Sequence, residues 1–373
     1  MITEWDDLLI HQIAYPFDHV DSTDSRWHDR HWFLVGDIQG EVILGFGMGC
    51  YPNRDVIDGF ACATVPGAQY NVLVSRELGA NRRTEVGPLR IEVVQGLRRI
   101  HASLAPNDHD VSFDLVYDST TPPFEEQTHY GRRRGRLITN NARYNQAGRW
   151  SGTLTVAGHT WQVTPERFWG ERDRSWGLRP GQGEPPQTTL TPEQRLEMLR
   201  ESGFGLYHYM PTQFPEYSLW YLISESPDSK ITALDGGIRF PWGSPRQDEV
   251  VRVCQVEHDM EFVAGTMRWT NARLALTLED GRVKRYTVRN ILPCYLNQGG
   301  GYGDPQRWHG SYRGKLAVDG GRFDLGSEES LARLGYANDY FSEWRCDDGE
   351  VGYGQFEYAI AASKRYGFGV GLV

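Results

Sequence analysis

The sequence lacks the long apolar run, signal peptide and cysteine pattern that would each indicate a familiar class of protein. No run of about 18 apolar residues occurs, so we expect no membrane span. Residues 1–7 carry neither a basic nor an apolar stretch, so we expect no secretory signal. The five cysteines include no CxxC pair, which argues against a zinc ribbon or a disulfide framework and indicates a reducing, cytoplasmic setting.

Positive charge and nucleotide-binding motifs are also scarce. The chain has 39 Lys and Arg against 49 Asp and Glu, a formal net charge of −10, which argues against nucleic acid as the main partner. The glycine-rich stretches at 45–49 and 299–303 fit neither a dinucleotide fingerprint nor a phosphate loop. Possible ligands beside His109 and His258 are adjacent in sequence and would point to opposite faces of a strand. We therefore expect no metal and no cofactor.

Aromatic residues and glycine are abundant. The chain has 12 Trp, 19 Tyr, 15 Phe and 42 Gly, a composition typical of many short strands and tight turns. Alternating apolar segments flank turn sequences at 37–40, 66–67 and 280–281, which predicts three hairpins. Strand follows strand at short spacing, so we predict an all-β fold of antiparallel β-barrels rather than βαβ units.

One helix and one domain boundary are predicted near the middle of the chain. Thr191 suits an N-cap, Pro192 the first helical position and Gln194 a capping box, and Gly203 would end the helix. The preceding segment 180–186 is linker-like. Residues 152–158 resemble residues 314–320, and 113–115 align with 274–276 at nearly the same offset, which indicates duplication. We predict one barrel over 1–185 and, after the linker helix, a second within 186–373.

The run Trp-Gly-Glu-Arg-Asp-Arg-Ser-Trp-Gly that begins at Trp169 is too charged for an ordinary core strand. On a strand, Trp169, Glu171 and Asp173 share one face, while Arg174 and Trp176 share the other. Two neighbouring carboxylates beside an indole raise the pKa of one of them. Such a carboxylic acid can protonate an alkene. The alternative is that these carboxylates pair with the adjacent arginines in a structural network.

The sequence resembles a known superfamily in four places, which span nearly the whole chain. These are Asp-Arg-His-Trp-Phe at 29–33, the run at 169–177, Trp-His-Gly at 308–310 and Gly-Tyr-Gly-Gln-Phe-Glu-Tyr at 352–358. They resemble the two-domain lipocalin-like superfamily of carotenoid hydratase (hydroxyneurosporene synthase) and the lipocalin-like Diels–Alderases, most closely an uncharacterised bacterial branch. The resemblance implies two barrels packed together, an apolar ligand site in or between them, and isoprenoid, polyene or polyketide-like substrates.

These observations lead us to interpret the protein as a cofactor-free lyase or isomerase acting on a lipophilic, isoprenoid-like or polycyclic small molecule. The reaction would be hydration or a cyclisation started by protonation. Asp173 or Glu171 would transfer the proton, and His31 or Tyr51 would relay it. The side chains that we expect to bind the substrate are aromatic, basic or acidic neighbours of these motifs: Trp32, Trp169, Arg174, Trp176, His208, Tyr209, Trp308, His309 and Glu357.

Other interpretations stay open at this point. The histidines also suit barrel-lining or rim positions, the aromatic rings suit a core, and the polar face that carries Glu357 suits solvent. The chain could be a non-catalytic carrier of an apolar metabolite, or a pericyclic catalyst that needs shape but no acid. Beyond the small molecule we expect no nucleic-acid partner and no membrane span, and a homodimer is compatible with the sequence.

Overall fold

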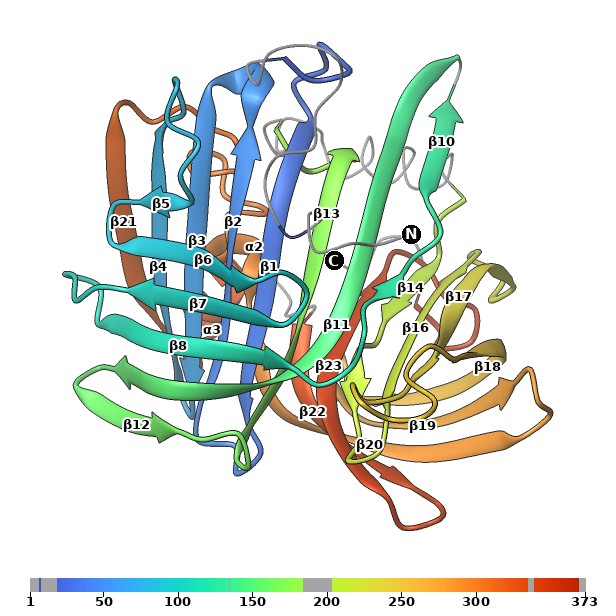
Figure 1. Cartoon of the computed structure of the whole chain (residues 1–373). Coiled ribbons are helices and arrows are strands. Elements are labelled where there is room, and N and C mark those ends of the chain that lie inside the picture. Colours follow the sequence, from blue (N-terminus) through green and yellow to red (C-terminus); the bar gives the residue numbers. More distant parts are fainter. Residues whose placement is uncertain (1–6, 8–18, 134, 184–202, 335–338, 369–373) are drawn as a thin grey trace. The chain divides into compact units, whose positions relative to one another are not determined.

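The computed structural model describes residues 7, 19–133, 135–183, 203–334 and 339–368 (Figure 1). The chain divides into two compact units. Unit 1 comprises Met1–Pro186 and Cys294–Ala337, and unit 2 comprises Gln187–Pro293 and Asn338–Val373. The division expected from the sequence, 1–185 and 186–373, differs from these units in the segment 294–337, which belongs to unit 1.

Unit 1 is built on one antiparallel sheet that curls over itself. Its main path runs in the order β21-β4-β3-β2-β1-β13-β11-β8-β7-β6-β5, with β9, β10 and β12 also paired to β11. The strands are β1 (Trp27–Asp37), β2 (Ile43–Tyr51), β3 (Val56–Val65), β4 (Ala68–Glu77), β5 (Glu85–Val86), β6 (Leu89–Gln95), β7 (Arg99–Leu104), β8 (Val111–Ser119), β9 (Phe124–Glu125), β10 (His129–Arg133), β11 (Arg136–Val156), β12 (His159–Val163), β13 (Phe168–Leu178) and β21 (Leu316–Asp324).

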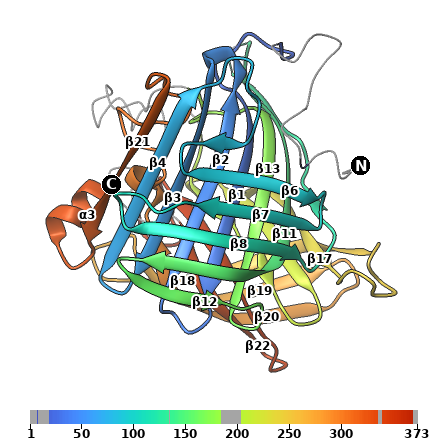
Figure 2. The same cartoon turned by 60° about the vertical axis from the view of Figure 1, so that its left-hand side comes forward.

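The long strand β11 makes the curl. Its first half pairs with β13 and its second half with β8 and β12. Strands β6 to β8 therefore cross β1 to β4 at a steep angle in both views (Figures 1 and 2). An apolar core fills the space between the two layers, including Phe33, Phe46, Tyr117 and Trp150. One face of β1 to β4 thus packs on this core. The opposite face carries the side chains of the candidate active site described below.

Unit 2 is a sheet of nine strands that closes on itself, because β16 pairs with β17 and β14 with β23. Its strands are β14 (Leu206–Tyr209), β15 (Thr212–Gln213), β16 (Ser218–Glu225), β17 (Ile231–Arg239), β18 (Val250–Phe262), β19 (Trp269–Leu278), β20 (Val283–Cys294), β22 (Asp339–Cys346) and β23 (Val351–Ile360). The predicted all-β class with two antiparallel barrel-like sheets is confirmed.

The three predicted hairpins are confirmed as β1–β2, β3–β4 and β19–β20. Gly67 and Gly281 take positive φ angles of 86° and 85° at their turns, which glycine adopts without strain. The structure differs from the predicted duplication in the position of one segment. The duplication places residues 314–320 in the second barrel, whereas strand β21 pairs with β4 at the edge of the first sheet.

Helices are few in the part of the chain that the structure describes. They are η2 (Pro52–Arg54), α2 (Leu296–Gly299) and α3 (Glu328–Leu334). The helix predicted from Thr191 lies outside the described residues. None of the described helices has the length and apolar character needed to span a bilayer.

Candidate active site on the outer face of unit 1

Strand β13 is the centre of the candidate site, because it pairs with β1 on one side and β11 on the other. Asp173 lies opposite Trp32 of β1 and Asn145 of β11. Directly opposed residues of antiparallel strands share a face. Alternation along β13 therefore puts Trp169, Glu171 and Asp173 on one face, as the sequence indicates.

The two arginines of the run turn to the other face, where different carboxylates hold them. The buried guanidinium of Arg172 forms an ion pair with Asp7, and its Nη2 donates to Gln146 Oε1 at 2.7 Å. Arg174 forms an ion pair with Asp29. The arginine beside Asp7 holds the pKa of that carboxyl well below its usual range, although burial opposes it. These arginines are thus engaged on the core side of the sheet.

Asp173 is half-buried on the opposite face, and no hydrogen bond from the described residues reaches its carboxylate. Burial raises its pKa above the ordinary value, and the guanidinium groups of Arg143 and Arg179 only partly oppose that effect. Arg143 is itself bound to the buried Glu126, with 2.6 Å between Nε and Oε2. A carboxyl group in this setting can stay protonated nearer neutral pH than a solvated one.

A second group on this face is centred on Arg30, which is fully buried in β1. Its Nη1 donates to Gln182 Oε1 at 3.2 Å, and its Nη2 lies 3.3 Å from His309 Nε2. Tyr51 donates its hydroxyl to the same Gln182 oxygen at 3.1 Å. Arginine can only donate, so His309 Nε2 accepts and its proton is on Nδ1, which lies 3.7 Å from Asp58 Oδ1. The group is therefore a connected polar network around one buried cation.

Neutral and aromatic groups surround this cation at close range. The Arg30 guanidinium carbon lies 4.9 Å from the Tyr302 ring centre and 5.7 Å from that of Phe60. Burial and the nearby Arg30 lower the pKa of His309 to about 4, so its imidazole is neutral. Burial raises the pKa of the Tyr51 phenol well above its usual range. Both side chains can thus offer a neutral hydrogen bond at ordinary pH.

The two groups lie on one continuous face. Arg30 is opposite Ser175 in the register, which makes it a diagonal neighbour of Asp173. Burial opposes the charged form of Arg30, but Tyr302, Tyr51 and Asp173 together raise its pKa above the ordinary value. The face thus carries a half-buried acid next to a buried cation, and Trp32 of β1 lies opposite the acid.

The structure separates His31 from this face. His31 pairs with Arg174 in the register, and its ring stacks near Phe33 on the core side, with 5.8 Å between ring centres. Burial and the charge of Arg174 lower its pKa to about 3. A direct relay from His31 to Asp173 would have to cross the sheet, whereas Tyr51 lies on the network side.

The predicted tryptophans divide between the two faces. Trp32 and Trp169 lie on the Asp173 face, and the Arg149 guanidinium stacks on the Trp169 ring at 3.1 Å from its centre. Trp176 lies on the core side, 5.6 Å from the Arg174 guanidinium. Trp308 directly precedes His309, and the Arg54 guanidinium carbon lies 4.5 Å from its ring centre. The structure therefore groups Trp32, Trp169 and Trp308 with the polar face and excludes Trp176 from it.

Three predicted substrate-binding residues belong to unit 2. His208 is fully buried inside the closed barrel, 4.6 Å from the His258 ring centre. Tyr209 lies opposite Glu357 in the β14–β23 pairing. Glu357 accepts a hydrogen bond from Gln355 at 3.2 Å. These residues form two separate groups within unit 2.

Sequence reasoning missed several members of the site. Arg30 lies inside the motif at residues 29–33, but nothing in that motif distinguishes it from a surface arginine. Arg143 and Asn145 alternate along β11, a signal that could have placed them on one face. Glu126 and Gln182 lie in segments without periodicity, and only the folded chain brings them to the network.

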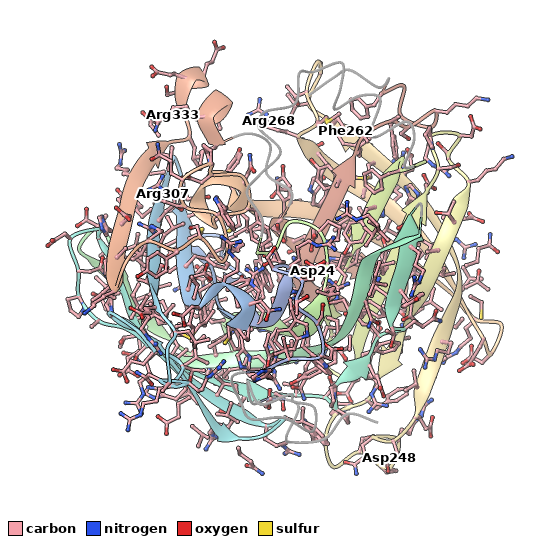
Figure 3. The ribbon with its side chains drawn as sticks, turned by 90° about the horizontal axis from the view of Figure 1, so that it is seen from above. Asp24, Asp248, Phe262, Arg268, Arg307 and Arg333 are labelled. Carbon is pink, nitrogen blue, oxygen red and sulfur yellow. The ribbon has the colours of Figure 1, made fainter. Side chains whose placement is uncertain are left out.

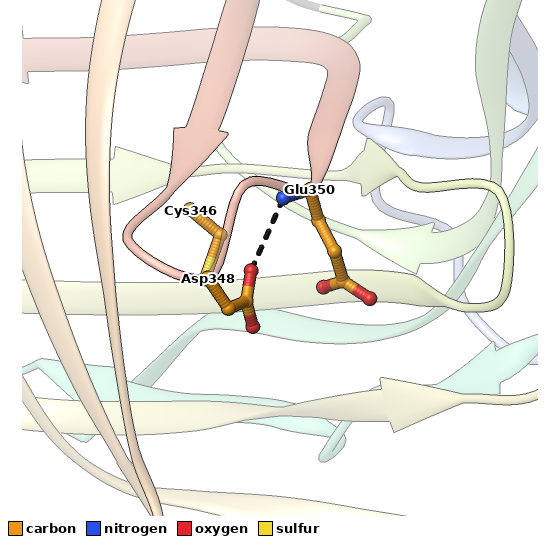
Figure 4. Close-up of side chains that lie close together, drawn as sticks. All are labelled: Cys346, Asp348 and Glu350. Atoms are coloured by element: carbon orange, nitrogen blue, oxygen red, sulfur yellow. Dashed lines mark hydrogen bonds between the residues drawn. The ribbon is translucent and has the colours of Figure 1, made fainter.

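Among the described residues of unit 2, one group of potential metal ligands lies at the β22–β23 turn (Figure 4). One ligand atom each of Cys346, Asp348 and Glu350 lies within 4.8 Å of the others. The ammonium of Lys284 already pairs with both carboxylates, at 3.3 and 2.9 Å. Burial raises the pKa of the Cys346 thiol, which disfavours the thiolate that a metal needs. We therefore interpret this group as a turn stabilised by the ion pairs of Lys284, and not as a metal site.

Comparison with known proteins places the chain in a family. A family of unknown function (DUF8625) matches residues 2–369. The chain belongs to this family. No curated protein matches its sequence.

Among solved structures, a putative AttH from Nitrosomonas europaea matches with a TM-score of 0.54 at 12% identity, covering 94% of this chain and 97% of that chain. Kievitone hydratase from Nectria haematococca has a TM-score of 0.44 at 14% identity and 94% coverage of both chains. CghA has a TM-score of 0.46 at 10% identity, covering 91% and 89%. The first of these likenesses shows that this chain and the Nitrosomonas protein share a fold, and it shows the fold alone.

Proposed function

We propose that this DUF8625 member is a cofactor-free enzyme that protonates a carbon–carbon double bond of a lipophilic small molecule, with Asp173 as the acid. The observation that carries the proposal is the placement of Asp173. It is half-buried opposite Trp32, while both arginines of its own run are bound to Asp7 and Asp29 on the other face. A carboxyl left without an ion pair in a water-poor, aromatic setting suits general acid catalysis.

The reaction balances without a cofactor. The Asp173 carboxylic acid gives its proton to one alkene carbon, which leaves a carbocation on the other and a carboxylate on the enzyme. In a hydratase, water adds to the cation and the resulting oxonium returns a proton to Asp173. In a cyclase, a second double bond attacks the cation, and loss of a proton from carbon restores the acid. The indole of Trp32 can stabilise the cation through its π face.

The Arg30 network would bind the polar end of the substrate or the attacking water. Tyr51 and His309 are neutral hydrogen-bonding groups, and Gln182 fixes both Tyr51 and Arg30. The surrounding aromatic rings support an isoprenoid-like or polycyclic substrate. We also propose a place for the chain in the uncharacterised bacterial branch of the superfamily, and a reducing, cytoplasmic setting, which its five free cysteines support.

The experiment begins with native mass spectrometry and organic extraction of the purified protein, to identify the class of any bound molecule. Candidate alkenes of that class, or a panel of terpenoid and polycyclic alkenes, are then incubated with the enzyme in D2O. We expect deuterium at one carbon of the product. We expect Asp173→Asn to lower turnover by about 100-fold or more, the range of general acid catalysis.

The matched control is Asp118→Asn, because Asp118 is an exposed aspartate that pairs with Arg99. We expect it to keep wild-type turnover. Full turnover by Asp173→Asn would exclude the acid role. Turnover without deuterium incorporation would favour a pericyclic catalyst, and tight binding with unchanged recovery of the ligand would favour a carrier.

A further inference from the structure

A cavity of about 260 Å³ lies in unit 1 at the sheet edge where β21 joins β4. Neither Asp173 nor Arg30 is among the residues that line this cavity, so it is distinct from the candidate active site. Its walls come from β4, from the segment after α2, from β21 and from α3. The lining residues are Asn71, Leu73, Arg307, Gly320, Gly321, Arg322, Phe323 and Arg333.

A missing side chain helps to create this space. Gly321 of β21 lies directly opposite Asn71 of β4, so both would project their side chains from the same face. A Cβ atom added to Gly321 would meet no atom within 4 Å. The neighbouring positions on that face carry Leu73 and Phe323. Gly321 therefore leaves a gap in an otherwise continuous row of side chains.

The floor of the cavity offers an unused hydrogen-bond donor. Asn71 is 1% exposed, and its Oδ1 accepts from Gln69 Nε2 at 2.8 Å. Its Nδ2 has no partner among the described residues. An unsatisfied buried amide N–H costs free energy, which a ligand oxygen would recover.

The rim of the cavity is basic in a chain whose formal net charge is −10. The guanidinium of Arg333 lies 5.5 Å from the Phe323 ring centre, and no carboxylate of the described residues pairs with it. Arg307 is bound to Asp304 at 2.6 Å, and Arg322 donates to Tyr70 at 3.2 Å. Seen from above, Arg307 and Arg333 lie beside the orange ribbon of β21 and α3 (Figure 3). Among the described residues, Arg333 is thus a guanidinium without a carboxylate partner.

We propose that this cavity binds a small metabolite through an oxyanion group, a carboxylate or a phosphate. Arg333 would pair with the oxyanion in the bidentate geometry that guanidinium favours. Asn71 Nδ2 would donate to one of its oxygens, and Gly321 leaves room for the ligand. The site goes beyond the proton-transfer function and does not depend on it.

The test is isothermal titration calorimetry of the full chain with inorganic phosphate, succinate and citrate as separate probes, in a buffer free of other oxyanions. Two variants remove different parts of the site. Arg333→Ala removes the free guanidinium, and Gly321→Leu fills the cavity without meeting a neighbour at Cβ. Arg268→Ala is the control, because Arg268 is an exposed arginine of unit 2 (Figure 3).

We expect saturable one-to-one binding of at least one probe, and the probe that binds tells carboxylate from phosphate. Loss of one charge-assisted contact should weaken binding by about tenfold or more in Arg333→Ala. Gly321→Leu should abolish binding, and Arg268→Ala should leave it unchanged. No saturable binding of any probe, or equal affinity in all variants, would overturn the proposal. Unchanged circular dichroism of both variants would show that their effects are local.

Discussion

At the scale of single residues, the charged run of β13 shows how the alternation of a strand places adjacent charged side chains on opposite faces of the sheet. Arg172 and Arg174 turn toward Asp7 and Asp29, and Asp173 turns away from them. Because a strand alternates its faces, residues adjacent in sequence cannot neutralise each other directly. The arginines therefore stabilise the inner side of the sheet, while the carboxyl group of Asp173 stays available for chemistry.

His208 leads to a prediction about acid stability. It is fully buried, and neither ring nitrogen has a hydrogen-bond partner among the described residues. Burial, with the charges of His258 and Arg365, lowers its pKa well below the ordinary 6.5. Because the folded-state pKa is lowered, only the unfolded chain binds a proton there as the pH falls below about 6.5. The wild-type protein should thus lose free energy of unfolding on acidification.

We expect His208→Leu to stabilise the protein by roughly 1 kcal/mol near pH 7, because it removes an unsatisfied buried group. Near pH 5 the gain should increase by roughly 2 kcal/mol, since the proton uptake by the unfolded chain is also removed. Urea unfolding at the two pH values measures both numbers. The control is His159→Leu, which removes an exposed imidazole and should change the free energy of unfolding by no more than about 0.5 kcal/mol. An equal effect of His208→Leu at both pH values would contradict the argument.

At the scale of elements, a pair of glycines lets β11, β13 and β1 approach closely. Gly148 lies opposite Gly170. A Cβ atom on Gly170 would overlap the carbonyl oxygen of Leu34 and lie 2.7 Å from Trp150 Nε1. The absence of that atom lets the Trp150 indole donate to the Leu34 carbonyl at 2.9 Å. The core tryptophan is thereby fixed at the point where β11 turns.

We expect Gly170→Ala to lower the free energy of unfolding by roughly 1–3 kcal/mol, the usual cost of overpacking. Gly321→Ala is the matched control, because it is also a strand glycine of unit 1 but has open space at Cβ. Its effect should stay within about 0.5 kcal/mol. Denaturant unfolding of the two variants makes the comparison. Equal stability of both variants would show that β13 can shift away from Leu34 at no cost.

At the scale of the whole molecule, unit 1 is assembled from two separate parts of the chain. Strand β21 pairs with β4, and Tyr295 exchanges hydrogen bonds with the buried amide of Gln69, at 2.8 and 3.0 Å. The backbone N–H of Gly310 donates to Asp58 at 2.6 Å. Residues 294–337 therefore satisfy buried polar groups of the first sheet, and the first 186 residues lack these partners when alone.

We expect a fragment of residues 1–186 to fail to reach the native fold, because those polar groups would lose their partners. A second fragment, in which residues 294–337 follow residues 1–186 through a Gly/Ser linker, should fold. Near-ultraviolet circular dichroism and binding of a hydrophobic dye distinguish the two outcomes. A cooperatively folded 1–186 fragment would instead support the continuous domain that the linker-like segment indicates.

Local patterns explain which parts of this protein could be predicted. The alternation of apolar residues and the turn dipeptides act over a few neighbouring residues, so they indicated the strands, three hairpins and the all-β class. The same alternation placed Trp169, Glu171 and Asp173 on one face. Candidate site residues were harder to predict, because His31 and Trp32 are adjacent and only the register shows which of them accompanies Asp173.

The sequence by itself determined where strands form and which side chains share a face, because both follow from the two-residue period of a strand. Only the tertiary structure decided which strands meet. It brought β21 to β4, Asp7 to Arg172, and Gln182 and His309 to Arg30. Such pairings join segments far apart in the chain and depend on burial and on satisfying charges, and no local periodicity records either.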